Sequence, residues 1–327
     1  MCIRDRLQTE ARAPWPRIDT LTVSAQGLSS REQAPVGTWL VQAQDQHGAK
    51  VSIRGQGHVA QGRAEHLVSL QAVQMVPWLA PVRPALALPV NLQQGAVSAD
   101  LQLLAQAPGH TARLTPQMPW PAASTGSGPT AATQAPLALE GPGLLVANGR
   151  ISIEGLKAQK ASPTPQGLPI EPEHLAWRRM DLEGLQGWLS AVPSPTAPPL
   201  RFVRLGTLAW EGLDARLTRP APSSTPPAPV AVRTGNAQPN TTAVDLGQLR
   251  CQDCQLAVRD ARASEPGVNL VLQRIELQTG ALSNDLQRPI RGALQASTPG
   301  QGKLAIEGEV RPAPLSARLK LLSLIHI

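Results

Sequence analysis

Apolar and polar residues alternate along much of the chain with a period of two. The clearest stretches are 20–25, 97–103, 151–154 and 315–321, where leucine, valine, isoleucine or alanine takes every second place. Successive side chains of a β-strand point to opposite faces of the sheet, so each stretch has one apolar and one polar face. The pattern predicts half-buried, mostly antiparallel strands.

Two local departures from this pattern predict specific features. Near Gln273 the alternation slips by one position, because Leu272 is followed by Ile275 rather than by an apolar residue two places on. An extra residue in one strand has this effect, so we expect a β-bulge there. One short helix is expected around Pro77-Trp78-Leu79, since proline is favoured in the first turn.

Segments rich in proline, serine, threonine and glycine interrupt the alternation. They lie at 108–136, 161–173, 190–199 and 219–243. Such segments bury too little apolar surface to offset the entropy of ordering, and we expect loops or disordered insertions. They divide the chain into three expected β units: 7–107, then 137–218 with loops at 161–173 and 190–199, then 244–321. The linkers between the units are 108–136 and 219–243.

The chain also repeats itself. Leu28-Ser29, Pro35 and Gly48 recur as Leu282-Ser283, Pro289 and Gly302, each 254 residues later. Both copies follow the order strand, turn, strand, glycine-rich hairpin, strand, strand. A weaker repeat relates 208–217 to 249–258. Repeats of this kind indicate an elongated, stacked β-structure.

The two ends of the chain differ from the rest. Residues 1–5 and 322–327 back-translate into sequences that are reverse complements over most of their length, and they resemble a transposon end used in sequencing libraries. We therefore expect both ends to be translated adapter and exclude them from reasoning about the fold. The chain is then an internal fragment of a longer protein.

Composition and charge exclude several classes of protein. Proline and glycine together supply 60 of 327 residues (33 and 27), which disfavours long helices. Three cysteines are too few for a disulfide-rich mini-protein. The net charge of +7 is spread over single positions without a basic block or an aromatic ladder, so we expect a solvated basic surface and no nucleic-acid partner.

The sharpest chemical motif is Cys251-Gln-Asp-Cys254. Such a pair could be a redox dithiol, half of a zinc site or a local disulfide. It lies between strand-like segments rather than at a helix start, and no further zinc ligands lie near it in the sequence. We therefore expect inert thiols or a structural disulfide between Cys251 and Cys254.

No other candidate chemistry stands out from the sequence. The histidines at 47, 58, 66, 110 and 174 lack metal-ligand spacing, and a surface position is the simplest expectation for each. The carboxylate pairs Asp181/Glu183 and Glu307/Glu309 fit a solvated strand face better than a glycosidase site. There is no nucleophile elbow or phosphate-binding glycine loop. We expect no catalytic, metal or cofactor residues, no cofactor, and no enzyme.

Several short stretches, taken in order, resemble the AsmA-like proteins of Gram-negative envelopes, in the branch catalogued only as a domain of unknown function. They are 17–30 followed by Pro35, 174–185, 205–217, and 256–260 with its continuation through 282–283, 289 and 302–319. The resemblance covers most of 17–321 outside the Pro-rich insertions. It implies an inner-membrane anchor outside this fragment and a long periplasmic β-structure curled into a groove.

The resemblance sets the expectations for fold and function. The expected fold is mostly β: an elongated, curled antiparallel sheet of repeated β units, with long disordered Pro-rich insertions and little helix. The expected protein is periplasmic, anchored to the inner membrane, and involved in outer-membrane biogenesis or maintenance. Its partner would be phospholipid or another envelope lipid, bound or carried passively in an apolar groove. The alternative is a non-catalytic structural or protein-interaction scaffold of the envelope.

Overall fold

The computed structural model describes twelve stretches of the chain. They are residues 15–31, 33–58, 60–81, 90–108, 116–119, 142–160, 173–191, 200–219, 242–260, 268–285, 288–313 and 315–324. Most of each Pro-rich segment, His110, residues 1–5 and residues 325–327 lie outside the described residues. The expectation of disorder and most of the adapter prediction therefore concern parts not described.

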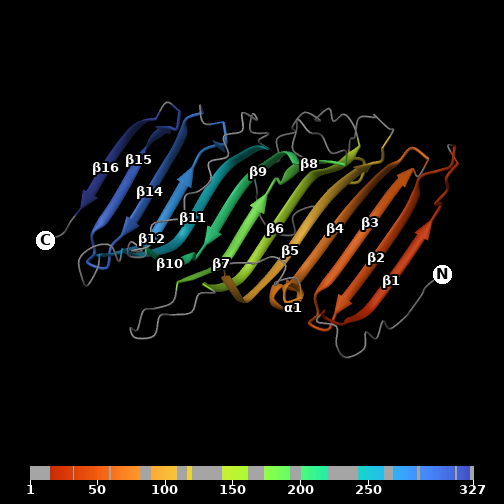
Figure 1. Ribbon diagram of the computed structural model, residues 1–327, viewed down its shortest axis with the longest axis horizontal. Helices are drawn as coiled ribbons and strands as arrows, with labels where there is room; N and C mark the ends of the chain where they lie inside the picture. The colour runs from red at the N-terminus through yellow and green to blue at the C-terminus, as the bar shows by residue number, and fades with distance from the viewer. Residues whose placement is uncertain are drawn as a thin grey trace, which may run out of the picture.

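The described chain is almost entirely β-structure in one sheet of 16 strands (Figure 1), which confirms the predicted fold class. The strands are β1 (Ile18–Gln26), β2 (Gly37–Asp45), β3 (Lys50–His58), β4 (Arg63–Gln74), β5 (Val90–Gln106), β6 (Gly143–Lys160), β7 (His174–Glu183), β8 (Gln186–Ser190), β9 (Leu200–Glu211), β10 (Asp214–Arg219), β11 (Ala243–Asp260), β12 (Val268–Thr279), β13 (Leu282–Ser283), β14 (Ile290–Ser297), β15 (Lys303–Arg311) and β16 (Ser316–Leu324). The predicted short helix is confirmed as α1 (Met75–Leu79). No helix among these residues is long and apolar enough to cross a membrane.

Most strands that follow each other in the chain pair with each other in the sheet, but some continue each other in one line. β6 pairs with both β7 and β8, and β9 pairs with both as well, so β7 and β8 are two halves of one line. β11 likewise pairs with both β9 and β10 at one constant register. Hydrogen bonding is continuous across all three predicted β units, because β5 joins β6 and β10 joins β11. The predicted unit boundaries stay predictions.

One junction departs from the expected antiparallel pattern, since β11 runs parallel to β9 and β10. A parallel neighbour must start again at the far end of the sheet, so its connection has to travel the length of a strand. β11 has 18 residues and is roughly 60 Å long. The 24 residue steps from Arg219 to Ala243 can reach roughly 80 Å. The Pro-rich segment 219–243 is therefore long enough for this crossover.

Both sequence repeats have structural counterparts. β14, β15 and β16 follow β12 in the way that β2, β3 and β4 follow β1, and each set pairs antiparallel in order. In the weaker repeat, Leu208 pairs with Leu249 and Trp210 with Cys251 across the parallel junction. The constant offset of 41 residues thus places equivalent positions side by side.

The pairing register separates the side chains into two faces. Partners across a ladder share a face, so one row runs through Leu70, Ala99, Ile151, Leu182, Leu208 and Leu249. The row immediately beside it runs through Ser69, Asp100, Arg150, Glu183, Thr207 and Gln248 on the opposite face. We call the first the inner face and the second the outer face.

Two lines of irregular residues cross the sheet from strand to strand. The first runs through Ala72, Gly95, Gly155, Arg178, Gly212, Asp253 and Arg274, and all of these except Arg178 have positive φ. The second runs through Gly149, Gly184, Gly206, Gly247 and Gly280. We use the term strand line for one strand together with any strand that continues it, as β8 continues β7 and β10 continues β9. Five strand lines each contain one residue of the first set and one of the second, always six residues apart: 149 and 155, 178 and 184, 206 and 212, 247 and 253, 274 and 280. We call them the first and second bend lines.

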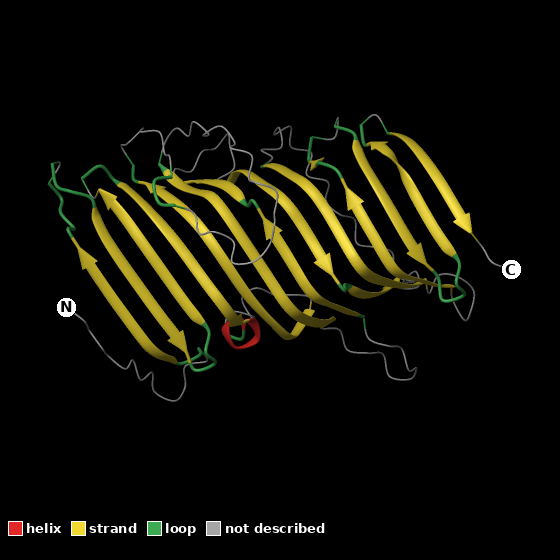
Figure 2. Cartoon of the chain, turned by 180° about the vertical axis from the view of Figure 1, so that it is seen from behind, coloured by secondary structure: helices red, strands yellow, loops and turns green. Residues whose placement is uncertain are grey.

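The bend lines curve the sheet. A bulge adds one residue to a strand, bends it and strengthens its twist. Register shifts mark the first line on β4, β5, β11 and β12, and the shift between Gln273 and Glu276 confirms the predicted bulge. The long strands accordingly bend towards their ends instead of running flat (Figure 2).

We predict that closing the space on the second bend line destabilises the sheet. A Cβ on Gly247 would lie 2.6 Å from the carbonyl oxygen of Gly206, which is backbone and cannot move aside. Gly247→Ala should lower the free energy of unfolding by about 1–3 kcal/mol, measured by chemical denaturation. The control is Gly300→Ala, since a Cβ there has nothing within 4 Å. Equal effects of the two substitutions would contradict the close approach.

Candidate functional site

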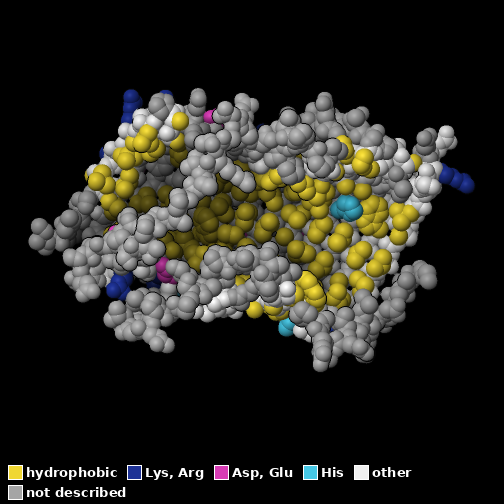
Figure 3. Space-filling model, in the orientation of Figure 1, with side chains coloured by type: hydrophobic (Ala, Val, Ile, Leu, Met, Phe, Trp, Pro, Cys, Tyr) yellow, Lys and Arg dark blue, Asp and Glu magenta, His cyan; other side chains and the backbone are white. Residues whose placement is uncertain are grey.

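The inner face carries a continuous apolar surface. Between the two bend lines each strand line presents two inner side chains, and we call this set the groove floor. It consists of Ile151, Ile153, Met180, Leu182, Leu208, Trp210, Leu249, Cys251, Leu277 and Thr279. All but Cys251 are only half-buried. Hydrophobic side chains gather on this side of the sheet, where the surface is hollowed (Figure 3).

A sheet normally buries its apolar face against a second layer. Here α1 is the one described helix that packs on the sheet, and it lies mainly against β4 and β5. The Trp78 indole N–H donates to Asp45 over 2.9 Å, and Trp15 packs against Trp78 at 6.4 Å between ring centroids. The helix is therefore fixed at one end of β2–β5 and leaves the groove floor uncovered by any described residue.

The floor has dimensions suited to an elongated apolar molecule. From β6 to β12 it crosses five strand lines (β6, β7, β9, β11 and β12), which are about 4.8 Å apart, so it extends roughly 19 Å across the strands. The acyl chains of one bilayer leaflet span about 15 Å. An extended hydrocarbon chain laid across the strands would therefore fit within the floor.

The structure joins Cys251 and Cys254 in a disulfide. The bond bridges the β11 bulge at Asp253, with a Cα–Cα distance of 6.1 Å, and both cysteines are at most 5% exposed. Ile275 and Ala296 are buried with them, and Trp210 and Leu277 of the floor pack against this cluster. The disulfide thus holds Cys251 in the groove floor. As a disulfide, the two cysteines offer no thiol to a substrate or a metal.

Ion pairs hold the same bend line from the outer face. Arg178 lies 2.8 Å from Asp253 and 3.5 Å from Glu211, and the backbone N–H of Asp253 donates to the Glu276 carboxylate over 3.1 Å. These side chains join β7, β9, β11 and β12. Each exposed pair contributes little alone, but together they and the disulfide fix the bend from both sides.

The carboxylates and histidines noted in the sequence do not form one cluster. Asp181 pairs with Arg179 at 2.8 Å and Glu309 with Arg291 at 2.9 Å, both on the outer face. His174 meets Asp214 at 3.1 Å, and His47 lies exposed in a turn beside Gln46. Of the described histidines, only His66 lies on the inner face, where it packs against Trp39. Within the described ranges no group of three or more His, Cys, Asp or Glu side chains could hold a metal ion.

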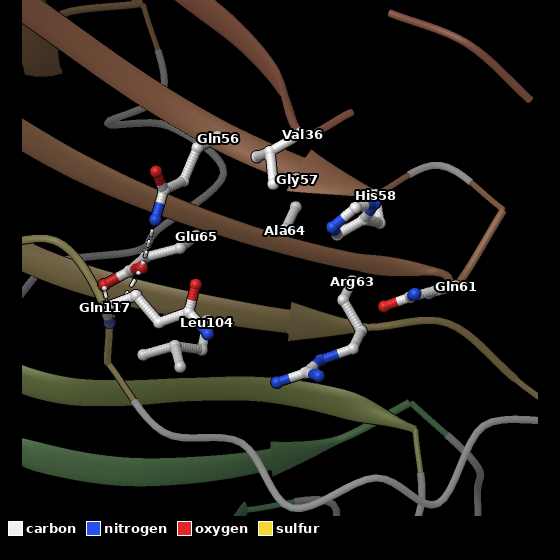
Figure 4. Close-up of a pocket in the computed structure, with 10 residues that line it drawn as sticks. All are labelled: Val36, Gln56, Gly57, His58, Gln61, Arg63, Ala64, Glu65, Leu104 and Gln117. Carbon is white, nitrogen blue, oxygen red and sulfur yellow. Dashed lines mark hydrogen bonds between the residues drawn. The ribbon is translucent and has the colours of Figure 1, made fainter. Parts of the chain in front are cut away.

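A small pocket on the outer face serves the fold. It has a volume of about 160 Å³ and contains Glu65, which is 6% exposed (Figure 4). The Glu65 carboxylate accepts hydrogen bonds from Gln56 and Gln102 and from the backbone N–H groups of Gln117 and Met118, at 2.8–3.1 Å. Its acceptor capacity is used by its own chain, so Glu65 anchors 116–119 to the sheet.

Sequence reasoning missed Glu65, because its partners are up to 53 residues away and nothing local marks it. It also missed the second bend line. The six-residue spacing between Gly206 and Gly212, and between Gly149 and Gly155, was a signal that could have located both bend lines.

The comparisons with known proteins are negative: no family model, curated protein or solved structure matches the chain. The apolar inner face and its chemistry therefore carry the functional argument.

We predict that the disulfide stabilises the fold. For a closed loop of four residues, loop entropy gives a stabilisation of about 2 kcal/mol. The double variant Cys251→Ala/Cys254→Ala should lose about this amount in chemical denaturation. A reducing agent should shift the wild-type midpoint in the same direction and leave the double variant unchanged. A wild-type midpoint insensitive to reduction would contradict a structural bond.

Proposed function

We propose that this protein is an AsmA-like protein of the Gram-negative envelope whose groove binds the acyl chains of phospholipid or another envelope lipid. In this proposal the chain lies in the periplasm, an inner-membrane anchor lies outside the chain, and the role is outer-membrane biogenesis or maintenance. The observation that carries the proposal is an apolar inner face whose floor no described residue covers. Its apolar row from Leu70 to Leu249 is continuous over six strand lines, while the adjacent outer row is polar.

Hydrophobic burial supplies the binding free energy. Each methylene moved from water into an apolar site contributes about 0.8 kcal/mol, so contact along even part of an acyl chain offsets the loss of its freedom. The floor is half-buried before any ligand binds. A lipid would therefore remove apolar surface from water on both partners.

The continuity of the rows suits movement along the groove. An acyl chain that crosses the strands from β6 to β11 meets isoleucine, methionine, leucine, tryptophan and cysteine, and the adjacent outer row is polar. Passive transfer of lipid needs no catalytic residue and no cofactor.

We predict that charges on the floor abolish lipid binding, whereas the same charges on the outer face do not. Leu208 and Leu249 are paired on the floor, and their neighbours Thr207 and Gln248 are paired on the outer face. Phospholipid co-purifying with the full chain should exceed that of an unrelated β-protein of equal size. It should fall at least tenfold in Leu208→Asp/Leu249→Asp, because an acyl chain would desolvate two carboxylates.

The matched control is Thr207→Asp/Gln248→Asp, which adds the same charge at the same height of the sheet. It should retain wild-type lipid content. If the wild-type chain carries no more lipid than the unrelated protein, lipid binding is wrong and the scaffold alternative is favoured.

A further inference from the structure

Near the N-terminal end of the sheet, the inner face contains two neighbouring side chains with hydrogen-bonding groups. Four inner rows cross β2–β5 beyond the end of the sheet where α1 lies, and three of them start on β1. They consist of Leu21, Ala43, Val51, Leu70 and Ala99, then Val23, Val41, Ile53, Val68 and Leu101, then Ala25, Trp39, Gly55, His66 and Leu103, then Gly37, Gly57, Ala64 and Ala105. Within these rows only Trp39 and His66 have side chains that can form hydrogen bonds.

The two side chains lie against each other. Their ring centroids are 5.2 Å apart, with 58° between the ring planes. Gly55 lies between them in the pairing, and the Trp39 indole occupies the space that a side chain at Gly55 would take. Ala64 and Ala105, beside His66 and Leu103 on the next row, are small and leave the imidazole accessible. We call Trp39 and His66 the polar notch.

The hydrogen-bonding groups of the notch are unused. Neither Nε1 of Trp39 nor either ring nitrogen of His66 has a partner in the part of the chain that the structure describes, and none of the three is sealed from solvent. The indole of Trp78 is bonded to Asp45 and that of Trp177 to the carbonyl of Ile153. The indole N–H of Trp210 on the groove floor also lacks a partner among the described residues, but unlike that of Trp39 it is sealed from solvent. Unpaired donors on an apolar face are costly when a ligand covers them, unless the ligand pairs with them.

Resting on the proposed lipid-binding function, we propose that the polar notch binds the phosphate of a phospholipid whose acyl chains lie on the adjoining apolar rows. Tryptophan provides one N–H donor, and imidazole provides one when neutral and two when protonated. Phosphate oxygens are strong acceptors, and the apolar surroundings strengthen each bond. The notch is thereby selective for a phosphorylated lipid over a neutral diacylglycerol.

The surroundings of His66 make phosphate binding at the notch depend on pH. Burial lowers the pKa of His66 below its usual value, and the Glu65 carboxylate opposes this in part. The residues that face the ring from β2, β3 and β5 are Trp39, Gly55 and Leu103, none of which titrates, and Glu65 lies on the opposite face. A phosphate at the notch would stabilise the imidazolium, so binding takes up a proton and strengthens as the pH falls from 8 to 5.5.

The test compares two lipids with identical fluorescent acyl chains, phosphatidylglycerol and diacylglycerol, titrated into the full chain. The wild-type protein should prefer phosphatidylglycerol. Trp39→Phe and His66→Leu should each weaken phosphatidylglycerol binding roughly fivefold and leave diacylglycerol binding unchanged. His66→Gln, which keeps a hydrogen-bond donor, should bind well at pH 8 but lose the gain at pH 5.5. Exposed His47→Leu is the control and should match the wild type, and inorganic phosphate should not displace the lipid.

The outcomes separate this inference from the proposed function. Equal losses for both lipids would mean that Trp39 and His66 act by packing alone, and equal affinity of the wild type for both lipids would mean that no phosphate is recognised. Either result overturns the polar notch and leaves lipid binding intact. If neither lipid binds the wild-type chain, both proposals are wrong.

Discussion

The structure depends on keeping the two-residue alternation in phase across every neighbouring strand. A shift of one residue would turn a whole strand over and place polar side chains in the apolar row. The bulges do not break the row because they recur on neighbouring strands. Gly155, Gly212 and Asp253 lie on one line, so neighbouring strands change phase together. The sheet can bend and still present Ile153, Met180, Trp210 and Cys251 on one face.

The parallel junction extends this surface by duplication. Residues 208–217 and 249–258 are neighbours at a constant offset, so Leu208 and Trp210 are continued by Leu249 and Cys251. Cys251 takes the position equivalent to Trp210, so the disulfide fills space there that an indole fills on β9. The same bond bridges the bulge at Asp253. The disulfide and the ion pairs of Arg178 on the outer face together hold the bend of the sheet in place. The apolar side chains of the floor depend on this bend but do not produce it.

Much of the fold could be predicted from the sequence, because alternation and turn chemistry are local. The strands near Leu21, Val97 and Ile151 and the bulge near Gln273 followed from spacing, and the helix at Pro77 from the preference of proline for a first turn. The parallel pairing of β11 did not, since strand direction depends on the path of a connection that has no pattern of its own. Glu65 and the contact of Trp39 with His66 were also beyond reach, because each depends on register between strands.

The central claim is that lipid lies on the inner face and not on the outer one. The most direct measurement places a photo-crosslinking amino acid at Leu208, and separately at Thr207, in cells grown with labelled phospholipid precursors. These neighbours on β9 point to opposite faces of the sheet. We predict labelled lipid adducts at position 208 and none at 207. Adducts at both positions, or at neither, would contradict the account.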